Sequence, residues 1–169
     1  MRRPSASSAL ILRRMTSQKR SNTKPEKVVR SVLRGLRVRY RIGQATLPGT
    51  PDVANKSRRW AIFVHGCFWH HHTNCGRATV PKQNRAWWLV KFGRNQQRDR
   101  EKLAILEGRG LAVLVIWECE TQDIGALRAR LEKWEPLGLL GPQARYAGFS
   151  RARTGLSTDL RSQPRHAIR

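Results

Sequence analysis

Apolar residues recur with two different periods in the first third of the chain. Over residues 24–36 they follow helical spacing, and Thr23 with Glu26 has the form of a capping box at the start of a helix. Residues 37–42 alternate between apolar and polar as a strand does, and a turn rich in Pro and Gly leads to a second short strand that starts at Asp52. The pattern predicts one helix followed by two strands.

Two almost continuous apolar runs lie further along the chain, at residues 60–65 and 111–117. Runs of this length predict buried strands. Helical spacing predicts helices over residues 84–92, 95–107 and 121–134. The predicted fold is therefore α/β, with a mixed central sheet flanked by helices.

The two ends of the chain lack this periodicity. We expect a flexible basic arm over residues 1–22, one folded domain over residues 23–135 and a flexible basic tail over residues 136–169. The sequence shows no transmembrane segment and no secretory signal, and its three cysteines do not make an even disulfide framework. We expect a cytoplasmic protein with no membrane partner.

Basic residues greatly outnumber acidic ones. The 169 residues include 34 Lys and Arg against 11 Asp and Glu, a formal net charge of +23, which indicates nucleic acid as the partner. Within the first 98 residues Glu26 and Asp52 are the only acids, beside 22 Lys and Arg. Each could be structural, Glu26 as a helix cap and Asp52 as a turn residue. A phosphate-binding surface tolerates acids where a divalent cation lies between carboxylate and phosphate, so both are candidate metal ligands.

Cysteine and histidine gather around the irregular segment 67–81, which has few apolar residues to order it. Thiolates and an imidazole in tetrahedral number form a structural zinc site. The alternative is three reduced, buried cysteines without metal. We favour a closed zinc site, in which His71 competes for the histidine position; the predicted ligands are Cys67, His72, Cys75 and Cys119.

Two more histidines, His65 and His70, lie beside this set. Asp52 opens one predicted strand and His65 closes the next, so antiparallel pairing would bring both side chains to the same edge of the sheet. Mg²⁺ on Asp52 and an imidazole that activates water are the parts of a phosphodiester hydrolysis site. Asp99 could orient the catalytic imidazole.

Aromatic residues are candidates for DNA contact. Phe68 and Trp69 lie in a polar segment, unlike Trp60 and Trp117, which lie in predicted strands and are assigned to the core. Trp88 follows another Trp, and neighbouring helical side chains point about 100° apart, so at least one of the two is expected to be exposed. An apolar wedge unstacks bases most easily where pairing is weak, which is how a protein can find a mismatch.

The stretch from residue 93 to residue 100 interleaves amides and guanidinium groups at a helix start, which indicates a face that contacts phosphate. The candidate polar DNA contacts are Lys82, Arg94, Asn95 and Arg98.

Six short motifs follow one another over about residues 15–120. They are Asn22-Thr23-Lys24-Pro25-Glu26, Leu47-Pro48-Gly49-Thr50-Pro51-Asp52, Ile62-Phe63-Val64-His65-Gly66-Cys67-Phe68-Trp69-His70, Val80-Pro81-Lys82, Gly93-Arg94-Asn95 with Arg98-Asp99, and Trp117-Glu118-Cys119. In this order and spacing they resemble the very-short-patch repair (Vsr) DNA mismatch endonucleases, and such a series of motifs is specific.

The resemblance implies a fold like the type II restriction endonucleases, a structural zinc, and Mg²⁺-dependent incision of one strand of double-stranded DNA. The cut would lie 5′ to the thymine of a T:G mispair, which arises when 5-methylcytosine is deaminated. Asp52 would bind Mg²⁺ with the main-chain carbonyl of Val64, and Glu26 would hold a water molecule of the ion's hydration shell. The resemblance also implies that His70 is the general base, supported by His65 and Asp99. The wedge that enters the DNA would be formed by Phe68, Trp69 and Trp88.

Val64 stands where Thr is frequent in the family, and a role through the carbonyl survives that change. We expect a monomer in the bacterial cytoplasm, associated with the nucleoid, with downstream repair proteins as further partners. Two alternatives are a restriction-type endonuclease on matched DNA and a zinc-containing DNA-binding protein without catalysis. The acids Glu26, Asp52 and Asp99 favour an enzyme over a pure binder.

Overall fold

The computed structural model describes residues 21–139. The predicted arm over residues 1–22 and the predicted tail over residues 136–169 lie almost wholly outside this range. Within it the elements follow the predicted order, with one helix, three strands, a helix, a strand and a helix. The protein has an α/β fold with a mixed four-stranded sheet, as expected.

Helix α2 (Lys24–Gly35) begins at the predicted capping box. The Glu26 N–H donates to the Thr23 hydroxyl at 3.4 Å, and the Thr23 N–H donates to the Glu26 carboxylate at 3.3 Å. These bonds satisfy N–H groups that have no partner inside a helix, which explains why the helix starts here. Its apolar face, with Val29 and Leu33, is fully buried in the core.

The sheet has the order β1-β2-β3-β4. The first three strands are antiparallel, and β3 and β4 are parallel, paired from Trp60 with Ala112 to His65 with Trp117. Parallel pairing places the carboxyl ends of β3 and β4 at the same edge of the sheet. The strands are β1 (Arg41–Ile42), β2 (Val53–Asn55), β3 (Trp60–His65) and β4 (Ala112–Trp117).

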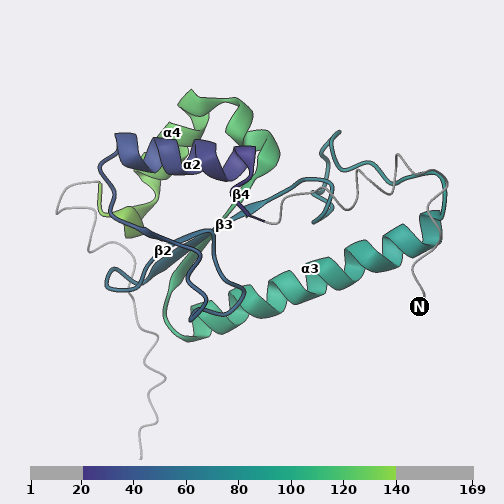
Figure 1. Ribbon diagram of the computed structural model, residues 1–169, viewed down its shortest axis with the longest axis horizontal. Helices are drawn as coiled ribbons and strands as arrows, with labels where there is room; N and C mark the ends of the chain where they lie inside the picture. The colour runs from purple at the N-terminus through teal and green to yellow at the C-terminus, as the bar shows by residue number, and fades with distance from the viewer. Residues whose placement is uncertain (1–20, 140–169) are drawn as a thin grey trace, which may run out of the picture.

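Helices cover both faces of the sheet. Figure 1 shows α2 and α4 (Ile124–Lys133) on one side and the long α3 (Arg85–Gly108) on the other. Alternate residues of β3 serve the two layers, because successive side chains of a strand point to opposite faces. Trp60 and Ile62 pack with α2 and α4, whereas Phe63 packs in a second cluster with side chains of α3.

The two helices predicted over residues 84–92 and 95–107 are one continuous helix, α3, so the predicted break is wrong. Gly93 lies inside it, exposed, and a Cβ there would meet no atom within 4 Å. A glycine inside a helix weakens it by about 1 kcal/mol, which is too little to end a helix of this length. The continuous α3 carries Trp88 near its start and packs against the sheet near its end through Leu103 and Leu106.

Other boundaries also shift. Only Arg41–Ile42 of the strand predicted over residues 37–42 pairs with β2, because Arg37 adopts a φ of 56° in the turn that leaves α2. The helix predicted over residues 121–134 divides into η1 (Glu118–Gln122) and α4. At the C-terminal end, η2 (Glu135–Leu137) extends the fold past residue 135.

Leu137 is completely buried in the core with α2 and α4, and its carbonyl accepts a hydrogen bond from Arg58 at 3.0 Å. The folded domain therefore includes residues 136 and 137, which had been assigned to the tail. No helix among residues 21–139 is long and apolar enough to cross a membrane.

Candidate active site and metal centre

A cavity of about 580 Å³ opens at the edge of the sheet where β2 begins and β3 ends. Its wall also includes the first turn of α2 and the middle of α3. The predicted antiparallel pairing of the strands that follow Asp52 and precede His65 is confirmed, and both side chains line the cavity. The lining holds all five of the predicted catalytic residues: Glu26, Asp52, His65, His70 and Asp99.

Asp52 lies at the start of β2 and turns its carboxylate toward β3. Asp52 Oδ2 accepts a hydrogen bond from the Val64 N–H at 2.7 Å. Burial raises the pKa of Asp52 to about 6, and the nearby Glu26 carboxylate adds to this, while the Val64 N–H and the Arg30 guanidinium oppose it. Among the described residues Asp52 has no ion pair, so a half-buried carboxylate that lines the cavity is available to a cation.

Glu26 is a helix cap, as its structural interpretation requires, and it also faces the cavity. Its carboxylate accepts hydrogen bonds from the Asn22 N–H at 2.8 Å and the Thr23 hydroxyl at 2.8 Å, and pairs with Arg30 at 3.3 Å. Both side chains of the ion pair are buried. Arg30, which sequence reasoning missed, lies one helical turn after Glu26 and neutralises its charge.

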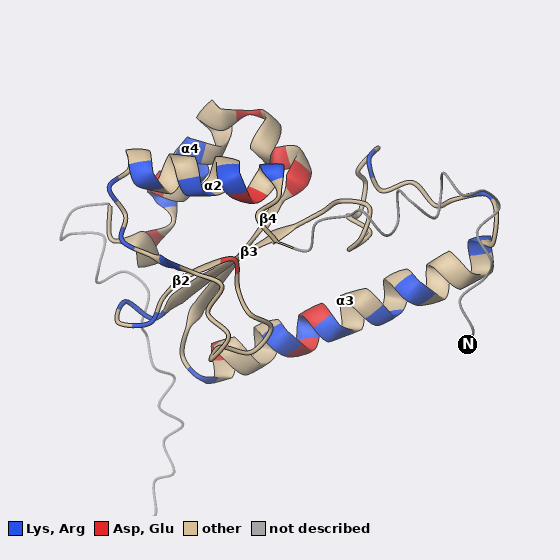
Figure 2. Cartoon of the chain, viewed as in Figure 1, with Lys and Arg blue, Asp and Glu red and all other residues tan. Residues whose placement is uncertain are grey.

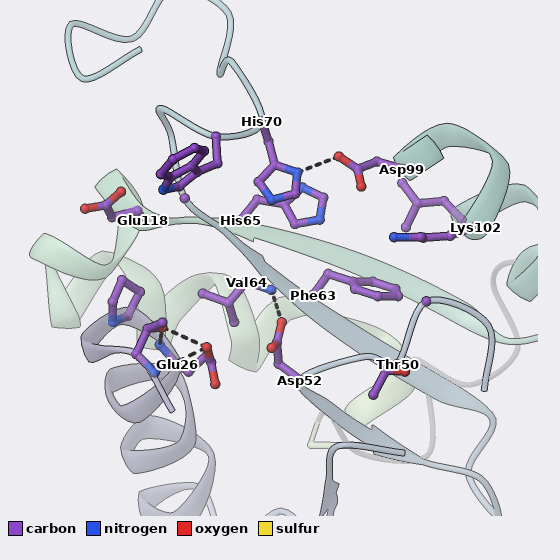
Figure 3. Close-up of a pocket in the computed structure, with 16 residues that line it drawn as sticks. Glu26, Thr50, Asp52, Phe63, Val64, His65, His70, Asp99, Lys102 and Glu118 are labelled. Atoms are coloured by element: carbon purple, nitrogen blue, oxygen red, sulfur yellow. Dashed lines mark hydrogen bonds and ion pairs between the residues drawn. The ribbon is translucent and has the colours of Figure 1, made fainter. Parts of the chain in front are cut away.

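The second group of cavity residues is His65, His70 and Asp99. Their ligand atoms lie within 4.8 Å of one another. The imidazole rings of His65 and His70 stack with their centroids 3.9 Å apart, and His70 Nδ1 lies 2.5 Å from Asp99 Oδ2. Figure 3 shows Asp99 reaching from α3 to the His70 ring, with the His65 ring beneath it.

Burial lowers the pKa of His65 to about 4, and the neighbouring His70 and Lys102 act in the same direction. Burial disfavours the charge of Asp99 as well, but the hydrogen bond with His70 and the positive charges around it outweigh this and hold the pKa of Asp99 below its usual value. His65 is therefore neutral and Asp99 ionised near pH 7. The Asp99 carboxylate faces His70 Nδ1 and so fixes the orientation of the His70 ring.

Two more charged residues, Lys102 and Glu118, line the cavity, and sequence reasoning gives neither of them a role. Lys102 lies three residues after Asp99 on α3, a spacing that places two side chains on the same helix face. Glu118 directly follows β4, whose end lies beside the end of β3. Its carboxylate accepts a hydrogen bond from the Cys67 N–H at 3.3 Å and pairs with Arg77 at 3.5 Å. The helical spacing from Asp99 is a signal in the sequence that points to Lys102, and the position directly after a buried strand is one that points to Glu118.

A separate cluster lies just beyond the end of β3. One ligand atom from each of four side chains lies within 4.8 Å of the others: Cys67, His72, Cys75 and Cys119. His72 Nδ1 is 3.7 Å from Cys67 Sγ and 3.4 Å from Cys119 Sγ. His71 instead stacks on Phe92, with centroids 4.8 Å apart. The cluster could hold a metal ion, and His72 is the histidine that faces the cysteines.

Trp117 separates the two groups of residues. Its ring stacks on His72 with the centroids 4.0 Å apart and contacts the His65 ring edge-on at 5.4 Å. The assignment of Trp117 to the core with Trp60 is thus wrong, because this ring is only partly buried and lies between two histidines. Trp60 is completely buried, as expected.

The predicted wedge residues form an aromatic group at the start of α3. Phe68 contacts Trp69, Trp88 and Phe92 with centroids 5.1 to 5.4 Å apart. Trp88 is 9% exposed and lies beneath this group, whereas Phe68 and Trp69 are half-buried. Phe68 and Trp69 thus form the more accessible part of the group, with Trp88 as its base.

The polar residues of α3 have two kinds of environment. Arg94, Arg98 and the loop residue Lys82 are exposed. Asn95 is half-buried, and its amide donates to the Trp69 carbonyl at 2.9 Å. Gln96 donates to the His71 carbonyl at 3.2 Å.

The first half of α3 is basic. Up to Arg98, α3 carries no acid, and Figure 2 shows Lys and Arg along this part of the helix. The amides hold the loop, while the cations lie exposed where a polyanion can reach them, with Arg98 also donating to Asn95.

Comparison with known proteins gives consistent relatives. The family described as "DNA mismatch endonuclease Vsr" matches residues 9–77. The chain is 48% identical over 117 residues to a "Type II nicking enzyme V.XorIIP" of Xanthomonas oryzae pv. oryzae, an alignment that covers 69% of this chain and 85% of the relative. It is 42% identical over 118 residues to the "DNA mismatch endonuclease Vsr" of Escherichia coli, covering 67% and 75%.

A "Type II nicking enzyme V.NmeAIP" of Neisseria meningitidis is 38% identical over 111 residues, covering 66% of this chain and 79% of the relative. Identity of this degree over most of a relative's length shows common descent. The chain belongs to the Vsr DNA mismatch endonuclease family and is a DNA endonuclease.

Proposed function

We propose that this endonuclease nicks one strand of duplex DNA 5′ to the thymine of a T:G mispair left by deamination of 5-methylcytosine, and so starts very-short-patch repair. The E. coli relative is named a mismatch endonuclease and the Xanthomonas relative a nicking enzyme. The observation that carries the proposal is one cavity lined by Asp52, His65, His70 and Asp99. In this cavity a carboxylate that can bind a cation lies together with an imidazole that can accept a proton, and hydrolysis of a phosphodiester bond can use both.

Magnesium fits the Asp52 side of the cavity. Asp52 offers a hard oxygen ligand that is half-buried and without an ion pair among residues 21–139, and Mg²⁺ prefers oxygen ligands. Asp52 and the carbonyl of Val64 would hold the ion, and Glu26 would orient water next to it. When bound, Mg²⁺ stabilises negative charge on a phosphoryl group and makes water more acidic.

His70 is the proposed general base. The proton on His70 Nδ1 is held by the Asp99 carboxylate, which leaves Nε2 to take a proton from the attacking water. Asp99 fixes the tautomer and stabilises the imidazolium that forms, as the carboxylate of a hydrolase triad does. His65 is neutral at pH 7, and its ring supports the His70 ring by stacking.

The cysteine cluster is the proposed site of a structural zinc. Three thiols and one imidazole match the donors of a closed tetrahedral zinc site. Because all four positions would be filled by the protein, the ion would have no open position for substrate. Its role would be to hold the segment after β3, which carries His70 and the wedge residues.

Recognition of the mispair is proposed for the aromatic group and the basic face of α3. Phe68 and Trp69 would insert between base steps, with Trp88 packed beneath them. Lys82, Arg94 and Arg98 would contact phosphate, and Asn95 would position Trp69 through its carbonyl. A type II restriction endonuclease-like fold and action as a monomer at the bacterial nucleoid complete the proposal.

The direct test uses end-labelled duplexes that differ in one base pair, T:G against T:A, in several sequence contexts, with and without Mg²⁺. We expect nicking of the thymine strand of the T:G duplex only, and only with Mg²⁺. Cleavage of the T:A duplex at a comparable rate, or of both strands, would favour a restriction-type enzyme on matched DNA. Binding of the T:G duplex without any incision would contradict the proposal, because this endonuclease would then cut a different substrate.

A further inference from the structure

Lys102 stands out among the residues of the cavity. Four carboxylates line it, from Glu26, Asp52, Asp99 and Glu118, and Lys102 is the one Lys or Arg among the described residues that do so. Glu26 is paired with Arg30, Asp99 with His70 and Glu118 with Arg77. The ammonium of Lys102 has no ion pair or hydrogen bond within residues 21–139. An unpaired cation in an acidic cavity is available to an anionic ligand.

The position of the Lys102 side chain is set by the loop before β2. Gly49 lies in that loop with a φ of +76°, and a Cβ at this position would come within 2.8 Å of Lys102 Cδ and 3.1 Å of Cγ. The loop backbone therefore packs directly on the aliphatic stem. Figure 3 shows the side chain extending from α3 above Phe63 toward the His65 ring. Its positive charge acts on His65 and on Asp99.

A strand of DNA that enters this cavity brings phosphates close to four carboxylates. A cation bound at Asp52 offsets that repulsion on one side. On the α3 side Lys102 supplies the positive charge, at a point where its half-buried stem limits the freedom of the ammonium. A charge-assisted hydrogen bond to phosphate is stronger than a neutral one, and lysine contacts phosphate as a point charge.

We propose that Lys102 binds a phosphate of the strand that is cut, inside the active-site cavity and on the α3 side. The residue is a specific phosphate contact that holds the strand against His70. This inference rests on the proposed function, because it takes DNA as the occupant of the cavity.

The test compares Lys102→Met with Lys102→Arg and a matched control, Lys133→Met. Met keeps the length of the stem without the charge, and Lys133 is exposed at the end of α4, on the other side of the sheet. Binding to a T:G duplex is measured against salt concentration without added divalent cation. We expect Lys102→Met to bind about tenfold more weakly and to lose about one unit of the salt slope, since each phosphate contact contributes about 0.9.

Lys102→Arg should keep the slope, and Lys133→Met should match the wild type. The contact is then mapped with duplexes that each carry one neutral methylphosphonate linkage in the cut strand. One position should weaken the wild type and leave Lys102→Met unaffected. Should the Met variant fail to fold, Lys102→Gln carries the same comparison.

An unchanged salt slope in Lys102→Met, or a methylphosphonate pattern identical to that of the wild type, would overturn the inference. A variant that binds normally but nicks with a shifted pH profile would also overturn it, since Lys102 would then act only through Asp99 and His65. Because binding is read without incision, the two failures are distinguishable: a wild type that does not nick T:G duplexes refutes the proposed function, whereas unchanged binding by Lys102→Met refutes this inference alone.

Discussion

Two groups of side chains that could hold a metal flank the end of β3, and they differ in how they meet solvent and substrate. The cluster of Cys67, His72, Cys75 and Cys119 brings four possible metal ligands together within itself. The group with His65, His70 and Asp99 lines a cavity, together with Asp52. His70 of one group and His72 of the other are neighbours in the same segment, and the Trp117 ring lies between His65 and His72.

The difference teaches that the same residue type can serve architecture or chemistry according to what surrounds it. His72 faces thiols, whereas His70 faces a carboxylate and a cavity. A closed set of ligands leaves no place for a reacting group. Damage to the cysteine cluster should therefore reduce folding, and damage to the cavity should reduce chemistry at constant fold.

The largest expected effect is loss of stability when the cysteine cluster is broken. Cys67→Ala and His72→Ala should lose bound zinc and lower the free energy of unfolding by on the order of 5 kcal/mol, because binding of a structural zinc is coupled to folding. His71→Ala is the control, since His71 stacks on Phe92 away from the cysteines. Zinc content by atomic absorption and urea unfolding check this. Equal zinc loss in His71→Ala would contradict the assignment.

A smaller free-energy change, confined to rate, is expected for His70→Ala. A positioned general base contributes about a hundredfold to ten-thousandfold, so the single-turnover nicking rate should fall by roughly a thousandfold. The unfolding free energy should stay within about 1 kcal/mol, because the His70 side chain is only half-buried. Zinc content should be unchanged. A variant that nicks at a normal rate would contradict the role of His70 as a general base. A variant that loses zinc would indicate that His70 belongs to the cysteine cluster instead of the cavity group.

The smallest effect is expected at the wedge. Trp69→Ala should weaken binding to a T:G duplex about tenfold, since stacking of an aromatic side chain on a base contributes about 1 to 3 kcal/mol. Trp88→Ala serves as the contrast, because Trp88 is almost fully buried and its loss should lower stability by about 3 kcal/mol. Fluorescence anisotropy and thermal unfolding separate the two. Equal loss of stability in both would argue against a wedge at Trp69.

Sequence reasoning placed most elements correctly because the apolar periods were clear. The capping box of Thr23 and Glu26 and the pairing of the strands after Asp52 and before His65 followed from local chemistry. The break predicted between residues 92 and 95 is wrong, since α3 continues through Gly93, a residue that favours a break. Helix propensity is a weak guide when a long helix has contacts at both ends.

The site was predictable where its members carry scarce chemistry, as the isolated acid Asp52 does. Lys102 was not, because one lysine among many basic residues has no distinguishing feature until the fold places it in a cavity. The role of Trp117 was missed for a related reason. An aromatic residue in an apolar strand predicts core packing, and only the parallel pairing of β3 with β4 brings it beside His65.

The most direct test of the division between chemistry and architecture is Asp52→Asn, which removes the charge and keeps an acceptor for the Val64 N–H. Nicking of a T:G duplex with Mg²⁺ should fall by at least about a thousandfold, since electrostatic stabilisation of charge in the transition state is a large catalytic contribution. Binding of the same duplex and zinc content should match the wild type. Unfolding free energy at pH 8 should be equal or higher, because burial raises the pKa of Asp52 to about 6. Nicking within tenfold of the wild type would contradict the account.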